Sequence, residues 1–133
     1  MRQLARTALA IDDDAPTLRL YRLLLEQAGM TVMTAGNGLE AIRIAVEHRP
    51  NLVITDLRLP LVSGLEVIRQ IRRHEPLGQI ATIVITAAAT AESERRSYEA
   101  GCDAFLVKPV PVLTFLSTVR RCLAREGERR KRA

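Results

Sequence analysis

The sequence predicts an α/β fold in which helices cover both faces of a five-stranded parallel sheet. Short apolar runs alternate in regular order with amphipathic stretches, which is the pattern of stacked strand–helix–strand units. Most of these runs are continuously apolar, as expected of strands that are covered on both faces. The strands are expected at residues 7–11, 31–34, 52–55, 82–86 and 104–107, and the second has the weakest pattern.

Helical periodicity lies between the apolar runs. Apolar residues spaced by three and four positions mark one face of each helix. The sets are Leu20, Leu23 and Leu24; Leu39, Ile42 and Val46; Gly64, Val67, Ile68 and Ile71; and Val112, Phe115, Leu116, Val119 and Leu123. Asp14, ahead of Pro16, is expected to cap the first helix. The helix expected at residues 91–100 has Tyr98 as its one large apolar residue, so it should pack lightly.

Length and charge bound the organisation of the chain. Its 133 residues suit one domain of ordinary size, expected over residues 1–126. The net charge is +5, yet residues 1–119 carry thirteen basic and thirteen acidic side chains, so the excess lies after them. Residues 127–133 have no apolar periodicity and are interpreted as a basic tail, the start of a linker or a weak polyanion patch. They do not by themselves predict nucleic-acid binding.

Compartment and redox state follow from what the sequence contains. No apolar stretch approaches the ~20 residues of a membrane span, and no signal-peptide core is present. We therefore expect a cytoplasmic protein without membrane association. Cys102 and Cys122 lack metal-ligand spacing and are interpreted as reduced thiols. His48 and His74 lie among charged residues at helix ends and are expected on the surface.

Polar residues stand at the ends of four apolar runs. Asp12 and Asp13 follow the first run, Asp56 follows the third, Thr86 ends the fourth and Lys108 follows the fifth. Because the carboxyl ends of parallel strands share one edge of a sheet, these residues are expected to converge. Three carboxylates, one hydroxyl and one ammonium would then share a cleft.

This set of groups suits phosphoryl transfer. A carboxylate that attacks a phosphoryl donor brings two anions together, so a cation is needed between them, and Mg²⁺ prefers carboxylate, phosphate and water oxygens. An aspartate in this position can form an acyl phosphate. Lys108 suits a phosphoryl oxygen as a point charge, and it is one of only two lysines among twenty basic residues.

The arrangement resembles the receiver domain of bacterial two-component response regulators over approximately residues 7 to 125. The resemblance implies a flavodoxin-like, doubly wound sheet with strand order 2-1-3-4-5. It implies that Asp56 accepts a phosphoryl group from a histidine kinase or phosphotransfer protein in a Mg²⁺-dependent reaction. Asp12, Asp13, Asp56 and the backbone carbonyl of Arg58 would hold the metal.

The resemblance also implies a conformational switch. Thr86 would donate its hydroxyl to the phosphoryl group beside Lys108, and Phe105 would rotate toward the space that the hydroxyl leaves. The face formed by the fourth helix, fifth strand and fifth helix would then bind a target or a second copy. The peptide between Lys108 and Pro109 would be cis. Self-phosphorylation and slow self-dephosphorylation are implied, without the turnover of an enzyme.

Structural interpretations stand beside the functional ones. Phe105 is favoured as a core residue over a switch, and Thr86 is evenly balanced between a strand-end hydroxyl that bonds its own loop and a phosphoryl ligand. Arg58 and Ala88 are expected to rim the site, where they would affect hydrolysis of the acyl phosphate in a direction the sequence does not predict.

Three other functions compete with phosphoryl acceptance. A flavin-binding electron carrier fits poorly, because three consecutive aspartates after the first strand would repel a flavin phosphate. A haloacid-dehalogenase-type phosphatase would need an acid where Arg58 stands, and a cap domain. The remaining alternative is a receiver-like module that binds proteins without being phosphorylated.

Overall fold

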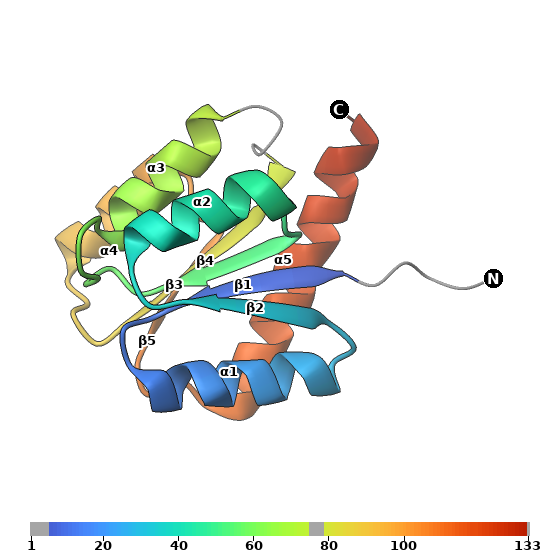
Figure 1. Ribbon diagram of the computed structural model, residues 1–133, viewed down its shortest axis with the longest axis horizontal. Helices are drawn as coiled ribbons and strands as arrows, with labels where there is room; N and C mark the ends of the chain where they lie inside the picture. The colour runs from blue at the N-terminus through green and yellow to red at the C-terminus, as the bar shows by residue number, and fades with distance from the viewer. Residues whose placement is uncertain (1–5, 75–78, 133) are drawn as a thin grey trace.

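The computed structural model describes residues 6–74 and 79–132. In these residues five strands alternate with five helices to form a three-layer sandwich (Figure 1). The elements are β1 (Thr7–Ile11), α1 (Ala15–Gln27), β2 (Thr31–Ala35), α2 (Gly38–His48), β3 (Leu52–Thr55), α3 (Gly64–Arg73), β4 (Ala81–Thr86), α4 (Ala91–Ala100), β5 (Ala104–Val107) and α5 (Val112–Arg132).

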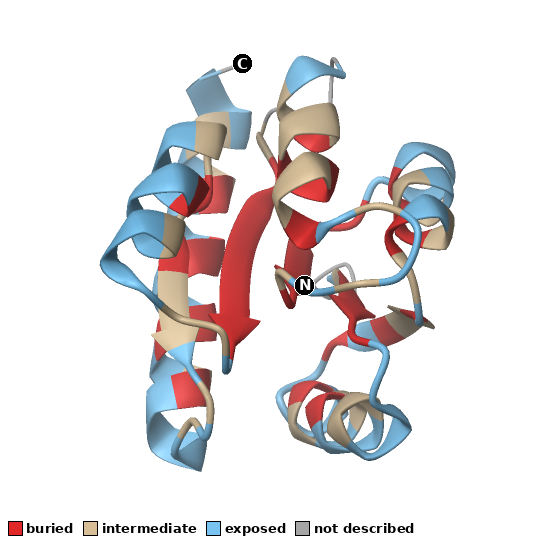
Figure 2. Cartoon of the chain, turned by 90° about the vertical axis from the view of Figure 1, so that its left-hand side faces the viewer, coloured by how far each residue is buried: buried red, intermediate tan, exposed pale blue. Residues whose placement is uncertain are grey.

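The five strands form one parallel sheet in the order β2-β1-β3-β4-β5. The predicted strand order and fold class are confirmed, and β1, β3 and β5 have the predicted bounds. Strand β2 runs one residue further than predicted, and β4 begins one residue earlier. In Figure 2 the buried sheet lies between helices whose outer faces are exposed. Alternate strand residues therefore face two separate apolar layers.

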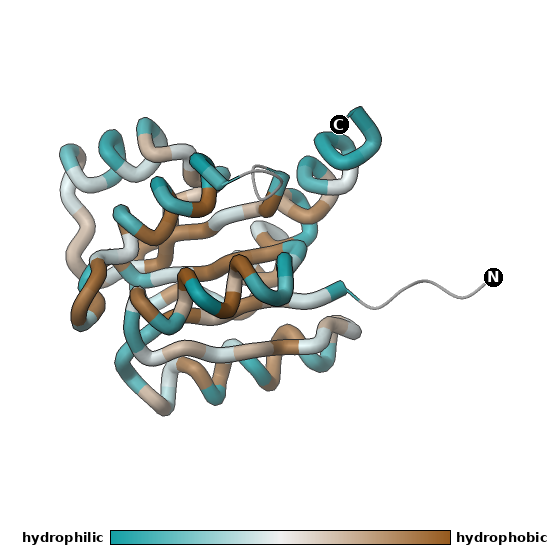
Figure 3. The backbone as a smooth tube through the Cα atoms, turned by 45° about the horizontal axis from the view of Figure 1, so that its top comes forward, coloured by the Kyte–Doolittle hydropathy of each residue, from teal (hydrophilic) through white to brown (hydrophobic). Residues whose placement is uncertain are grey.

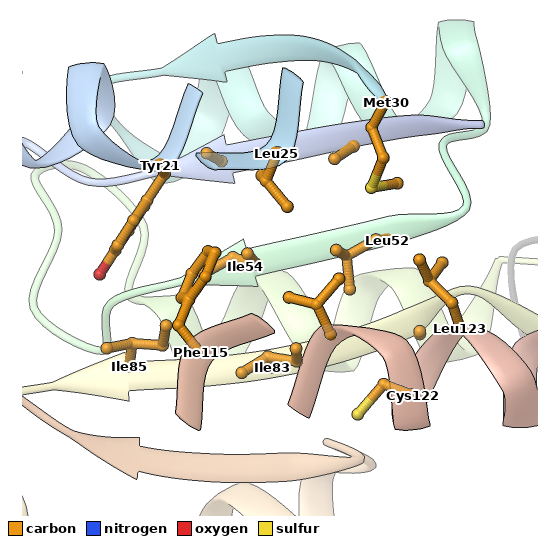
Figure 4. Close-up of a cluster of buried hydrophobic side chains, with 14 of the residues drawn as sticks. Tyr21, Leu25, Met30, Leu52, Ile54, Ile83, Ile85, Phe115, Cys122 and Leu123 are labelled. Atoms are coloured by element: carbon orange, nitrogen blue, oxygen red, sulfur yellow. The ribbon is translucent and has the colours of Figure 1, made fainter. Parts of the chain in front are cut away.

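One apolar layer lies between the sheet and the pair of helices α1 and α5 (Figure 4). Tyr21 and Leu25 of α1 meet Phe115 and Leu123 of α5 over the side chains of the central strands. The rings of Tyr21 and Phe115 are stacked, with centroids 5.3 Å apart and an interplanar angle of 14°. This aromatic pair joins the two helices on that face of the sheet.

Helices α2 and α3 cover the opposite face of the sheet and leave part of the expected apolar stripe of α2 outside. Ala41 and Ala45 are buried against the sheet, whereas Leu39 is 59% exposed and Val46 is 40% exposed. Small alanines let the helix lie close to the strands, so the larger side chains of α2 fall on its flanks. The predicted face of this helix was therefore wrong for Leu39 and Val46, although Ile42 packs partly buried against this layer, and the predicted face of α3 is confirmed.

The first helix shows the same difference. Tyr21 and Leu25 are buried. Of the apolar face predicted for this helix, Leu24 packs partly buried against the core, but Leu20 and Leu23 are about half exposed. The predicted cap is confirmed, because the Asp14 carboxylate accepts a hydrogen bond from the backbone N–H of Thr17 at 3.1 Å. Helix α4 is lightly packed as expected, with Ser97 buried.

The basic segment predicted as a tail continues α5 as a helix as far as Arg132 (Figure 3). Arg129 pairs with Asp103 at 3.1 Å and donates to the carbonyls of Gln79 and Ile80. One turn earlier, Glu126 is buried and accepts hydrogen bonds from Asn51 and Arg130. Polar contacts hold these last turns of α5 in place, so the apolar periodicity of the sequence did not predict them.

Asp103 connects this end of α5 to the sheet and to α3. It accepts hydrogen bonds from the backbone N–H of Thr82 at 2.9 Å and from Arg72 at 3.2 Å, as well as from Arg129. The group formed by Arg72, Asp103 and Arg129 lies at the amino ends of β4 and β5, opposite the edge where the predicted site lies. No helix in the described part of the chain is long and apolar enough to cross a membrane.

The role of Arg129 can be tested by substitution. Arg129→Gln removes the ion pair with Asp103 and carbonyl hydrogen bonds, and we expect it to lower the free energy of unfolding by about 1–3 kcal/mol. Arg132→Gln is the control, since Arg132 is exposed on the same helix, and should change it by less than about 0.5 kcal/mol. If the two variants lower the free energy of unfolding equally in urea denaturation, the contacts of Arg129 do not stabilise the fold.

Candidate functional site

The register of the sheet brings the predicted site residues together at its carboxyl edge. Ile11 lies opposite Thr55 in the pairing of β1 with β3. The backbone N–H of Asp56 donates to the carbonyl of Ile11 at 3.2 Å, and that of Asp12 donates to Ala35 at 3.1 Å. Asp12 and Asp56 therefore leave the sheet as neighbours, although 44 positions separate them in the sequence.

Lys108 joins these two carboxylates. Its ammonium lies 2.7 Å from Asp12 Oδ2 and 2.8 Å from Asp56 Oδ2. The backbone N–H of Lys108 donates to the carbonyl of Thr86 at 3.0 Å, which fixes the start of the connection to α5. The following peptide, between Lys108 and Pro109, is cis as predicted. Residues from three strand ends thus meet in one group of charges.

The surroundings of Asp56 favour its carboxylate form. Burial raises the pKa of Asp56, but hydrogen bonds from Lys108, from the Thr86 hydroxyl and from the backbone N–H of Arg58 together hold the pKa below its ordinary value of 3.8. Burial lowers the pKa of Lys108, whereas its bonds to Asp12 and Asp56 raise it further, and the net shift is upward. Near neutral pH Asp56 and Lys108 are therefore both charged.

The metal ligands implied by the resemblance are only partly assembled. Asp12 is buried, and its second oxygen accepts a hydrogen bond from the backbone N–H of Asp14 at 2.9 Å. Asp13 is exposed beside it. Within residues 6–74 and 79–132, no three carboxylate, imidazole or thiol side chains form a ready metal-binding group. The donor chemistry nevertheless suits a hard cation, because all three side chains are carboxylates.

Thr86 and Phe105 occupy the positions expected of them. Thr86 ends β4 and is buried, and its hydroxyl accepts a hydrogen bond from the backbone N–H of Ala88 at 3.0 Å. The same hydroxyl contributes to the lowered pKa of Asp56. Thr86 thus bonds its own loop and also reaches the carboxylate. Phe105 is partly buried and packs against the cluster of Ile68, Val84 and Cys102.

Gly64 at the start of α3 fixes the backbone of Asp56, a role that the sequence did not predict. A Cβ added to Gly64 would lie 1.8 Å from the carbonyl oxygen of Asp56. The backbone N–H of Gly64 donates to the carbonyl of Leu57 at 3.0 Å, and the Thr55 hydroxyl donates to the carbonyl of Asp56 at 2.8 Å. The first turn of α3 therefore packs directly against the residue that carries the carboxylate.

A tight turn shapes the rest of the connection between β3 and α3. Leu61 has a positive φ of 72°, and the backbone N–H of Val62 donates to Pro60 across it at 2.8 Å, which makes a γ-turn. A Cβ on Gly38 would lie 2.1 Å from the carbonyl oxygen of Val62, so the turn rests on the start of α2. These close approaches were not visible in the sequence, because they depend on the packing of α2 and α3.

Comparison with known proteins decides the family. The sequence matches the family model of the response regulator receiver domain over residues 8–120, which is most of the chain. The chain belongs to the response regulator receiver family. Receiver domains take part in two-component signalling with histidine kinases or phosphotransfer proteins, and they are generally not turnover enzymes.

Relatives and solved structures agree with this assignment. The chain is 36% identical over 118 residues to the polar-differentiation response regulator DivK of Brucella anthropi, covering 89% of this chain and 96% of the relative. A CheY-like receiver domain from Methanospirillum hungatei superposes with a TM-score of 0.89 at 26% identity, covering 95% of this chain and 99% of the other. The chemotaxis protein CheY4 of Vibrio cholerae gives a TM-score of 0.84 at 27% identity, covering 90% and 99%.

The contact between Gly64 and Asp56 predicts a large effect of one methyl group. Gly64→Ala should lower the free energy of unfolding by about 2 kcal/mol or more, because backbone must move to admit the Cβ. Gly36→Ala is the control, since a Cβ there meets nothing within 4 Å, and we expect a change within about 0.5 kcal/mol. Similar denaturation midpoints for the two variants would contradict the close packing at Gly64.

Removing Lys108 leaves two carboxylates without their shared cation. In the presence of EDTA, we expect Lys108→Met to lower the free energy of unfolding by about 2–4 kcal/mol. This is toward the low end of the loss expected on breaking a buried ion pair, because the Lys108 side chain is partly exposed. Lys131→Met changes the exposed second lysine and should have little effect. If Lys108→Met is as stable as the parent protein at neutral pH, the ammonium does not hold the site together.

Proposed function

We propose that Asp56 accepts a phosphoryl group and that the chain relays a signal through the change this makes in its surface. The proposal rests on the ammonium of Lys108, which bonds Asp12 and Asp56 together at the carboxyl edge of the sheet. A carboxylate with a lowered pKa, a cation at bonding distance and a hydroxyl within reach are the groups that an aspartyl phosphate requires. Membership of the receiver family supports the same assignment.

In this reaction an oxygen of Asp56 attacks the phosphorus of a phosphohistidine on the donor protein. An O–P bond forms as the N–P bond to the donor imidazole breaks, and the electron pair of that bond stays on the imidazole nitrogen. Asp56 needs no base, because its carboxylate is already ionised. Lys108 then donates to an oxygen of the new phosphoryl group, and Thr86 donates its hydroxyl to another.

The cofactor proposed for this reaction is Mg²⁺. Asp12, Asp13, Asp56 and the backbone carbonyl of Arg58 would hold it, and when bound it would neutralise the negative charge shared by the carboxylates and the incoming phosphoryl group. A receiver domain of the same fold, from the sensor histidine kinase PA1611 of Pseudomonas aeruginosa, has a magnesium ion coordinated in its active-site cleft.

The proposed output is a change on the face formed by α4, β5 and α5. If Thr86 turns toward the phosphoryl group, its bond to Ala88 is lost, and the loop that leads into α4 is released. Phe105 then has space to move inward from its partly buried position. Tyr98, Val107 and Val112 are exposed on this face, which suits a target protein or a second copy. Slow self-dephosphorylation would restore the starting state.

Phosphoryl acceptance can be tested by the intact mass of the protein after incubation with acetyl phosphate and Mg²⁺. We expect one added phosphoryl group, dependent on Mg²⁺ and removed by hydroxylamine, and no addition to Asp56→Asn. Asp14→Asn is the matched control, because it removes an exposed carboxylate from the same edge while asparagine still caps α1.

Two results of this labelling experiment would contradict phosphoryl acceptance by Asp56. Labelling of Asp56→Asn to the same extent as the parent protein would show that another residue accepts the group. If neither acetyl phosphate nor a phosphohistidine donor labels the folded parent protein, the chain is a receiver-like binding module that works without phosphorylation.

A further inference from the structure

A groove of about 720 Å³ lies between α1 and α5, at a place that the phosphoryl-transfer site does not use. Its lining comes from the C-terminal half of α1, the turn into β2, the residue before β1 and the middle of α5. The lining residues are Arg6, Leu24, Gln27, Ala28, Gly29, Met30, Leu116, Val119, Arg120 and Leu123. The volume falls in the range of small-molecule sites, which occur between helices. We call it the α1–α5 groove.

The floor of the α1–α5 groove is apolar. Met30, Val119 and Leu123 are at least nine-tenths buried in the layer between the sheet and these helices, and Leu24 and Leu116 pack partly buried beside them. Met30 and Leu123 lie on the same side of the sheet in Figure 4. A ligand in the groove would therefore cover an apolar surface that is continuous with the core, which favours a hydrocarbon group there.

The rim of the α1–α5 groove carries positive charge and no negative charge. Arg6 and Arg120 both line it, and Gln27 is the one other residue there with a polar side chain. Among the described residues, neither arginine has a carboxylate within 4.0 Å. Arg22 of α1, by contrast, pairs with Glu26. The two guanidinium groups are thus available to an anion.

We propose that the α1–α5 groove binds a free amphipathic organic anion, an acyl chain of medium length that ends in a carboxylate. The chain lies on Met30, Val119 and Leu123, and the carboxylate accepts hydrogen bonds from Arg120 or Arg6. A second copy of the chain is a poor occupant, because it would bring four guanidinium groups together at the interface. A membrane surface suits a concave space between two helices less well than a free molecule does.

The test uses methyl NMR signals of methionine, because two methionines report on opposite faces of the sheet. Met30 lines the groove, whereas Met33 packs in the layer between the sheet and α2. Decanoate is added below its micelle concentration to the full chain. We expect a saturable shift of the Met30 signal at one equivalent, with the Met33 signal unchanged. Octanoate, which has two fewer methylenes to bury, should bind about tenfold more weakly.

Charge is tested with matched variants and a matched probe. Arg120→Gln should weaken decanoate binding about tenfold, whereas Arg121→Gln, on the outer side of the same helix, should leave it unchanged. Arg6→Gln tests the second guanidinium, and an unaltered amide spectrum shows that each variant is folded. Decyltrimethylammonium has the same chain with a positive head group and should not shift the Met30 signal.

Several results would overturn the proposal. The proposal is wrong if decanoate does not shift the Met30 signal, or if decyltrimethylammonium shifts it equally. It is also wrong if the affinity for decanoate is unchanged when both Arg6 and Arg120 are replaced. A Met30 shift that appears only with anionic phospholipid vesicles would assign the surface to a membrane. A Met30 shift that depends on protein concentration in the absence of any ligand would assign the surface to a second copy of the chain. Asp56→Asn protein should bind decanoate normally, so the result does not depend on phosphorylation.

Discussion

Parallel pairing of β1 with β3 sets Ile11 opposite Thr55, so the two strands deliver Asp12 and Asp56 to the same point. Two largely buried carboxylates at that point would repel each other, and Lys108 joins them with one ammonium. Lys108 is itself positioned by its backbone bond to Thr86 at the end of β4. The site therefore depends on the register of the whole sheet, and Lys108 links the carboxylate of Asp56 to the connections that follow β4 and β5.

The opposite edge of the sheet has a polar group of its own, which holds the last turns of α5 against the sheet. Asp103, at the start of β5, pairs with Arg72 from α3 and Arg129 from α5 and also accepts the backbone N–H of Thr82. Because this group contacts elements from both faces of the sheet, it ties the three layers together away from the site. Helix α5 spans both edges, since it begins just after Lys108 and ends beyond Arg129.

Strands, strand-end residues and the cap at Asp14 could be predicted from the sequence, because each is set by a local pattern of apolar and polar residues. The helix faces were harder. Ala41 and Ala45 pack on the sheet in place of Leu39, since close approach to the strands selects small side chains. The last turn of α5 and the contact of Gly64 with Asp56 were missed for a different reason. They depend on partners distant in sequence and leave no periodic signal.

The residue that carries the phosphoryl group can be identified chemically. Protein labelled by acetyl phosphate and Mg²⁺ can be reduced with borohydride, which converts an acyl phosphate of aspartate to homoserine, and the altered residue can be located by peptide mass spectrometry. We expect homoserine at position 56 and nowhere else. Homoserine at position 12 or 13, with Asp56 unaltered, would contradict this expectation.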